Sequence, residues 1–147
     1  MPAGSFQLVS LDVDSISGVL VAPLCTRLSA TLRTLCFSFD WRAESFTEEQ
    51  EQALQLLTSL QYLFIGGCRV LQSLPQVLHR LPSLESLQIS GSYRIRSLPK
   101  EGFPESLQRL SISDCCPELY KECQQLRGTR PDIQVYAYLP SRTTNED

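Results

Sequence analysis

The stretch LESLQISGS at residues 84–92 decides the fold, because close copies of it recur along the chain. One copy is LQYLFIGGC at residues 60–68, and another is LQRLSISDC at residues 107–115, so the spacings are 24 and 23 residues. Shorter copies are LVSLDV at residues 8–13 and LRTLCF at residues 32–37. A last copy, IQV at residues 133–135, has Arg130 in place of the leading leucine.

This pattern predicts a leucine-rich-repeat solenoid, because such repeats are 20–29 residues long. Alternating side chains of a strand point to opposite faces, so the leucine-type positions of each copy face one side and bury against the next coil. We expect an α/β solenoid with a curved parallel β-sheet. The predicted domain spans residues 1–139, with repeats starting near residues 8, 32, 60, 84 and 107, a C-terminal helix–strand cap at 116–137, and a flexible tail at 140–147.

Between the predicted strands, the return segments carry a second mark that recurs in phase. It reads VLVAP at residues 19–23, LQSLP at 71–75 and IRSLP at 95–99, and proline favours an extended path there. The stretch TEEQEQALQLL at residues 47–57 instead predicts a helix, with Thr47 as N-cap and Gln50 completing a capping box. A second helix is predicted to open at Cys116-Pro117 and to stop at Gly128.

Composition and charge narrow the function classes. The chain has 147 residues, of which 42% are hydrophobic and 20% charged, and this argues against disorder, collagen and coiled coils. A net charge of −3 disfavours nonspecific electrostatic binding of nucleic acid. No apolar run reaches the ~20 residues that span a bilayer. We therefore expect a cytoplasmic protein with no nucleic-acid or membrane partner, whose six cysteines stay reduced.

Neither the cysteines nor the usual motifs predict catalysis or metal binding. The cysteines have no metal-ligand spacing, and His79 is the only histidine, so we expect no metal and no cofactor. Cys68 and Cys115 stand where these repeats turn, and we expect them to be buried and structural. The phosphate-loop, dinucleotide-binding and nucleophile-elbow motifs do not occur, so we expect a protein without enzymatic activity.

The outward positions of the strands form the candidate partner-binding site, because a rigid sheet would hold them in a grid. These residues are Thr34, Cys36, Tyr62, Phe64, Ser86, Gln88, Arg109 and Ser111. Tyr62 and Phe64 are the prominent pair, since aromatic residues and arginine are frequent interface anchors. The alternative is that both rings merely cover their neighbours across the strands. Because a repeat begins at Leu8 without a preceding cap, we also expect the chain to be the C-terminal piece of a longer protein.

Several stretches resemble the C-terminal leucine-rich-repeat region of grass nucleotide-binding leucine-rich-repeat disease-resistance proteins. They are FTEEQ at 46–50, LQLLTSLQ at 54–61, LQSLP, IRSLP, and above all ISDCCPEL at 112–119 with LRGT at 126–129. The resemblance implies a recognition module for a pathogen effector, a guarded host protein or the receptor's own nucleotide-binding domain. The coiled-coil and nucleotide-binding parts of that family have no counterpart here, so nucleotide binding does not carry over.

Three functions remain open from the sequence. The favoured one is a non-enzymatic protein-recognition module of plant innate immunity that acts through the outward face of the sheet. The second is a scaffold or decoy fragment with purely structural protein–protein contacts. The third, from another class, is a thiol-dependent enzyme that uses Cys36.

Overall fold

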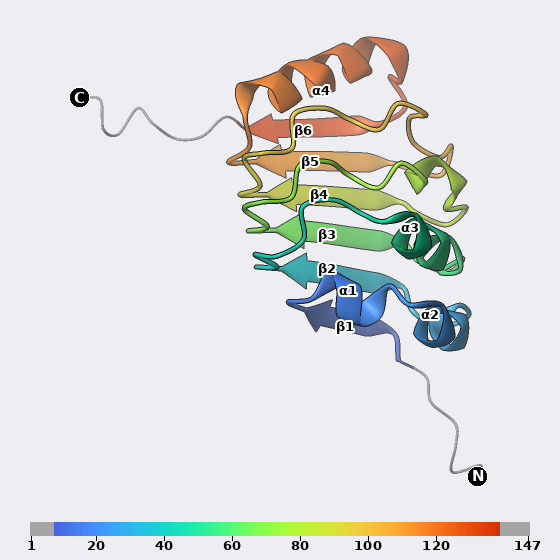
Figure 1. Ribbon diagram of the computed structural model, residues 1–147. Coiled ribbons are helices and arrows are strands. Elements are labelled where there is room, and N and C mark those ends of the chain that lie inside the picture. Colours follow the sequence, from blue (N-terminus) through green and yellow to red (C-terminus); the bar gives the residue numbers. More distant parts are fainter. Residues whose placement is uncertain (1–7, 139–147) are drawn as a thin grey trace.

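The computed structural model describes residues 8–138 and folds them into one six-stranded sheet with short helices (Figure 1). All neighbouring strands are parallel, and their spatial order is their order in the chain, β1-β2-β3-β4-β5-β6. The strands are β1 (Ser10–Val13), β2 (Thr34–Ser38), β3 (Tyr62–Gly66), β4 (Ser86–Ser90), β5 (Arg109–Ser113) and β6 (Gln134–Tyr138). The helices are α1 (Ile16–Val19), α2 (Ala22–Leu28), α3 (Glu48–Gln55), the 3₁₀ turn η1 (Leu78–Arg80) and α4 (Pro117–Thr129).

From β1 to β5, the strand register pairs the residues that the recurring pattern equates. Leu63 lies opposite Leu87, and Leu87 lies opposite Leu110. Two residues further along, Ile65, Ile89 and Ile112 form a second ladder across the same three strands. All of these side chains are at most 1% exposed, so the predicted inward face of the strands is confirmed.

One face of the sheet carries the core. The segments that connect consecutive strands pass over the same face, and the helices lie on that side or beside it (Figure 1). Their apolar side chains, such as Leu71, Leu78 and Ile95, are fully buried against the inward ladders. Within residues 8–138, no segment covers the opposite face, and its side chains are half-exposed at alternate positions along β2, β3 and β4.

The predicted helix at residues 47–57 is confirmed as α3, although it ends at Gln55. The Thr47 hydroxyl accepts from the Gln50 backbone N–H at 3.1 Å, and the Gln50 side chain accepts from the Thr47 N–H at 3.0 Å. This is the predicted capping box, and Glu48, Glu49 and Glu51 lie in the first turn, where the helix dipole favours negative charge. Glu51 also accepts from the Gln76 backbone N–H in the next return segment.

The predicted extended path at residues 19–23 is wrong. Two helices, α1 and α2, occupy this part of the chain. The hydroxyl of Ser15 caps α1 by accepting from the Gly18 N–H at 3.0 Å. Pro23 lies in the first turn of α2, where the missing N–H of proline costs no helical hydrogen bond. A Leu-Pro or Ala-Pro pair is therefore compatible with either path, and the neighbouring residues decide between them.

At the other end, α4 begins at Pro117 as predicted, but Gly128 does not stop it. The helix continues to Thr129, and its cap is Arg130. A Cβ at Gly128 would meet no atom within 4 Å, so no close contact requires a glycine there.

The prediction that Arg130 takes the place of the leading leucine in the last coil is wrong. Leu110 pairs with Val135 and Ile112 with Ala137, so the buried Ile133 takes that place and the register differs by two residues from the predicted one.

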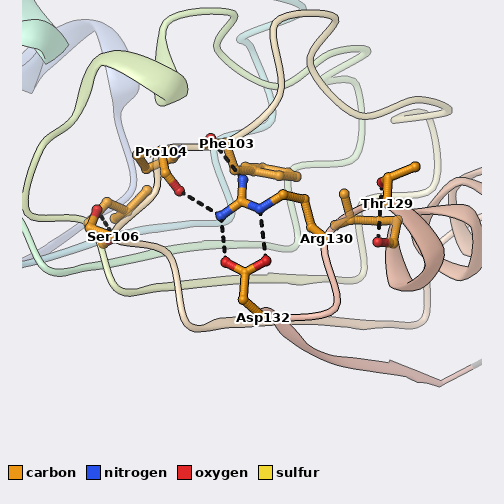
Figure 2. A network of polar contacts seen from close by, with 8 residues as sticks. Phe103, Pro104, Ser106, Thr129, Arg130 and Asp132 are labelled. Atoms are coloured by element: carbon orange, nitrogen blue, oxygen red, sulfur yellow. Dashed lines mark hydrogen bonds and ion pairs between the residues drawn. The ribbon is translucent and has the colours of Figure 1, made fainter.

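Arg130 lies three residues before Ile133 and has a different role. Its guanidinium donates to the carbonyl oxygens of Phe103 and Pro104, both at 3.2 Å, and pairs with both carboxylate oxygens of Asp132 (Figure 2). The carbonyls belong to the segment between β4 and β5, so the arginine ties the terminal helix and β6 to the preceding coil. Polar contacts here replace the apolar packing of the interior.

Cys68 and Cys115 are buried at equivalent positions after β3 and β5, as predicted. The Cys68 Sγ lies 3.6 Å from the Gly66 carbonyl oxygen, and the Cys115 Sγ lies 3.4 Å from that of Ser113. Burial raises the pKa of both thiols, which keeps them neutral weak donors to these carbonyls. At the same position after β4, the Ser92 hydroxyl faces the Ser90 carbonyl at 3.5 Å.

Candidate functional site

The face of the sheet that the return segments leave bare, here called the uncovered face, brings the predicted site residues together. Its rows follow the strand register, so that each outward residue lies beside its equivalents on the neighbouring strands. One predicted row is Thr34, Tyr62, Ser86 and Arg109, and the next is Cys36, Phe64, Gln88 and Ser111. All eight predicted residues lie on this one face, and all are half-buried except Arg109, which is exposed.

Tyr62 is fixed by a polar contact between neighbouring strands. Its phenol donates to the Oε1 of Gln88 on β4, with 2.6 Å between the oxygens. Burial, together with the nearby Cys36, raises the pKa of Tyr62, so the phenol remains a donor at neutral pH. The ring is thereby held in one orientation on the uncovered face, which lowers the entropy cost of binding a partner.

Phe64 makes a packing contact that could not be predicted from the sequence. Its ring lies over Gly66 of the same strand, and a Cβ at Gly66 would collide with the Cζ and Cε2 atoms of the ring. The glycine gives the ring room to lie flat along the strand, where it stays half-exposed. This contact lies within β3, so it differs from the alternative that the two rings cover their neighbours across the strands.

Cys36 lies between Asp12 on β1 and Phe64 on β3 in the second row. Burial is the main cause that raises the pKa of this thiol, and the negative charge of Asp12 raises it further. A reactive cysteine needs the opposite, an electropositive setting that lowers the pKa. His79 lies in η1 of a return segment, with its Nδ1 3.1 Å from the Gln76 carbonyl oxygen, and so is not on the uncovered face.

A third row runs across the ends of the strands and consists of Ser38, Gly66, Ser90 and Ser113, most of which carry a small hydroxyl group. Ser38 donates to the Asp12 carboxylate at 3.4 Å, and Ser90 and Ser113 share a hydrogen bond of 3.2 Å. Such groups offer donors and acceptors without bulk, so an approaching chain can reach the sheet between the aromatic rings.

The last strand extends the uncovered face beyond the predicted rows. Gln134, Tyr136 and Tyr138 lie beside Arg109, Ser111 and Ser113. Tyr136 is 41% exposed and Tyr138 is 58% exposed, and the Tyr136 phenol donates to the Gln134 side chain at 3.0 Å. The alternation in QVYAY at residues 134–138 carries this signal, but the prediction ended the strand at Val135 and missed both tyrosines.

Chemically, the uncovered face offers aromatic rings, hydroxyls, amides and one arginine in a rigid arrangement. Across residues 8–138, no three histidine, cysteine or carboxylate side chains are placed to hold a metal ion. No helix in the described part of the chain is long and apolar enough to cross a membrane. This arrangement of side chains is suited to contact with another molecule's surface.

Comparison with known proteins yields no assignment: no family model matches the chain, and no curated protein matches it significantly.

Proposed function

We propose that the chain is a leucine-rich-repeat solenoid that acts as a non-enzymatic protein-recognition module. Three observations support the repeat architecture. Strands follow one another in chain order, equivalent leucines and isoleucines are in register, and each connection returns over the same face. In a solenoid of this kind each coil buries its apolar face against its neighbours, which matches the fully buried ladders.

Recognition through the uncovered face rests above all on the Tyr62–Gln88 pair. A tyrosine held by a 2.6 Å hydrogen bond on an otherwise bare sheet is a preorganised anchor, and Phe64 lies beside it on the same strand. Arg109 adds an exposed cation two strands away, in the same row as Tyr62. We propose a protein partner, because these are the residue types that dominate protein interfaces.

The resemblance to grass disease-resistance receptors names the biological setting that we propose. In that setting the module acts in the cytoplasm in plant defence, and it binds a pathogen effector, a guarded host protein or the nucleotide-binding domain of a receptor. The six cysteines, all of them free thiols, suit a reducing compartment.

Proximity labelling in leaf cells tests this proposal. The full chain would be compared with the triple variant Tyr62→Ala, Phe64→Ala and Arg109→Ala, and with the matched control Thr26→Ala on the exposed side of α2. We expect the triple variant to lose a defined set of labelled proteins that the control retains. An identical set for all three proteins would overturn recognition by the uncovered face. A set that holds nothing but a receptor's nucleotide-binding domain would favour the scaffold alternative.

A further inference from the structure

The first residue after each of four strands has the same unusual backbone conformation. Phe39 after β2, Gly67 after β3 and Gly91 after β4 all have a φ of 64°, and Asp114 after β5 has a φ of 51°. Glycine adopts this left-handed region freely and aspartate tolerates it, whereas for a bulky aromatic residue it is a true outlier. Phe39 is nevertheless 63% exposed, so the burial of its ring is too small to offset the energy of this strained conformation. Strain of this kind tends to be kept where it serves a function.

Two residues further along, the same loops place Trp41, Arg69 and Tyr93 at equivalent positions. The Trp41 indole donates to the Gly67 carbonyl oxygen at 3.1 Å, and the Arg69 guanidinium lies 5.4 Å from the centroid of the indole ring. Trp41 is 59% exposed and Tyr93 is 54% exposed. We call the surface formed by Phe39, Trp41, Arg69, Tyr93 and Arg94 the aromatic edge. It follows the ends of β2, β3 and β4, and none of its five residues belongs to the strands that carry the uncovered face.

A hollow lies at each end of the aromatic edge. One, of about 610 Å³, is lined by Phe39 and Trp41 together with residues that follow β1, among them Asp14 and Ser17. The other, of about 600 Å³, is lined by Gln72, Tyr93, Arg94 and Arg96. An elongated ligand could therefore lie along the loops and place a side chain in each hollow.

The five residues of the aromatic edge include two arginines and no carboxylate, and the exposed Asp14 lines the hollow beyond Phe39 and Trp41. Arg130–Asp132 is the single ion pair among residues 8–138, so neither Arg69 nor Arg94 has a carboxylate partner there. Asp40, next to Trp41 in the chain, is turned inward and is 5% exposed. Its carboxylate accepts backbone N–H bonds from Ile16 at 2.7 Å, Arg42 at 3.0 Å and Ala43 at 3.1 Å, and it forms no ion pair with Arg69 or Arg94.

We propose that the aromatic edge is a docking surface for an acidic segment of a partner protein. Carboxylates of the segment would pair with Arg69 and Arg94, and an apolar side chain would rest between Trp41 and Tyr93. Stacking on Trp41 leaves the N–H groups at the edge of the Arg69 guanidinium available for a carboxylate. This proposal does not depend on the function of the uncovered face.

A protein segment fits better than single-stranded nucleic acid, which also binds to aromatic rings and arginines. A nucleic-acid groove tracks a long phosphate backbone with a continuous row of cations. Here the exposed acid Asp114 follows β5, one strand beyond the aromatic edge, and the chain carries a net charge of −3. The positive stretch is therefore short, and its length suits a few carboxylates.

A display library of short random peptides, selected against the full chain, tests the proposal. We expect the selected peptides to combine carboxylates with an aromatic or aliphatic residue. Their affinity, measured by fluorescence anisotropy, should fall roughly tenfold or more in Trp41→Ala, Tyr93→Ala and Arg69→Glu, and should weaken as salt rises. Tyr93→Ala keeps the test valid if Trp41→Ala disturbs its loop, because no hydrogen bond of the Tyr93 side chain is found within residues 8–138.

Two matched variants show whether binding is specific to the aromatic edge. Arg27→Glu makes the same charge change as Arg69→Glu on exposed α2, and Val21→Ala shortens an exposed apolar side chain next to that helix, so both should retain peptide binding. Selection of no peptide, or of peptides whose binding survives the three edge variants, would overturn the proposal. So would an oligothymidylate that binds the chain more tightly than any selected peptide and is released by Trp41→Ala.

Discussion

The ring of Phe39 covers Gly67, and both residues have a φ of 64° at the first position after neighbouring strands. A Cβ at Gly67 would lie 2.5 Å from the Phe39 Cδ1 atom. The same backbone position thus carries a strained phenylalanine in one coil and, in the next, the glycine that makes room for its ring.

This relationship predicts opposite effects of substitution at equivalent positions. Phe39→Asn should leave the free energy of unfolding unchanged or raise it by up to about 1 kcal/mol, because asparagine tolerates a positive φ. Gly91→Ala should lower it by about 1–2 kcal/mol, because its φ of 64° strains alanine although the nearest atom is 3.6 Å away. Urea unfolding of the two variants measures both. If both substitutions lower the free energy of unfolding equally, the conclusion that the Phe39 backbone is strained is wrong.

Core burial predicts a contrast between adjacent residues of β4. Leu87 is fully buried, and Leu87→Ala should cost roughly 2–5 kcal/mol of stability through lost burial and the cavity that remains. The same substitution at the equivalent Leu63 or Leu110 should cost a similar amount. Ser86→Ala, one residue earlier on the uncovered face, is the matched control and should change stability by less than about 0.5 kcal/mol. Equal costs for Leu87→Ala and Ser86→Ala would contradict the assignment of faces.

Asp40 predicts a loss of stability in acid. Burial raises the pKa of its carboxyl, but the backbone N–H bonds from Ile16, Arg42 and Ala43 outweigh burial and hold the pKa below its usual value. A lowered folded pKa gives stability that is complete above the unfolded value of about 3.9 and is lost as the pH falls through the folded value. Asp40→Asn should therefore cost about 1–3 kcal/mol near neutral pH, and the difference from the parent should shrink in acid. Unfolding curves across this range measure it, and a difference that is constant with pH would disprove the role of the charge.

Arg130 predicts a local effect at the end of the sheet. Arg130→Ala removes the donors to the Phe103 and Pro104 carbonyls and should cost about 1 kcal/mol, with faster amide exchange in β6 and α4. Arg130→Lys should not restore the full effect, because a lysine ammonium cannot reproduce the planar fork. Arg27→Ala on exposed α2 is the control and should leave exchange unchanged. Faster exchange spread evenly over all six strands would contradict a local tie.

Strands β1 to β5 could be predicted from the sequence, because an L-x-x-L-x-L pattern of constant phase fixes both their faces and their register. The predicted register of β6 was wrong by two residues, because Ile133 resembles the strand position of Leu110 but takes the leading position of Leu107. The eight candidate residues followed from that register, since Tyr62 and Ser86 are equivalent positions of two copies. The path of the return segments could not be predicted, because Pro23 fits the first turn of α2 as well as an extended chain. The predicted end of the helix at Gly128 was wrong for a related reason, since glycine permits a helix to end but does not force it to end.

The aromatic edge could not be predicted for a different reason. Trp41, Arg69 and Tyr93 differ in chemistry, so no recurring residue type marks their shared position in the loops. The positive φ after β2 could not be predicted either. Glycines at positions 67 and 91 suggest a positive φ, whereas a phenylalanine at position 39 does not. Sequence periodicity reports what each coil has in common, whereas these side chains are what distinguishes one coil from the next.

The arginine at position 130 also bears on how the end of the sheet would come apart. Its donors bind the Phe103 and Pro104 carbonyls and the Asp132 carboxylate, so α4 and β6 cannot leave the segment before β5 unless these bonds break together. The last helix and strand would therefore detach as one unit when unfolding begins at this end.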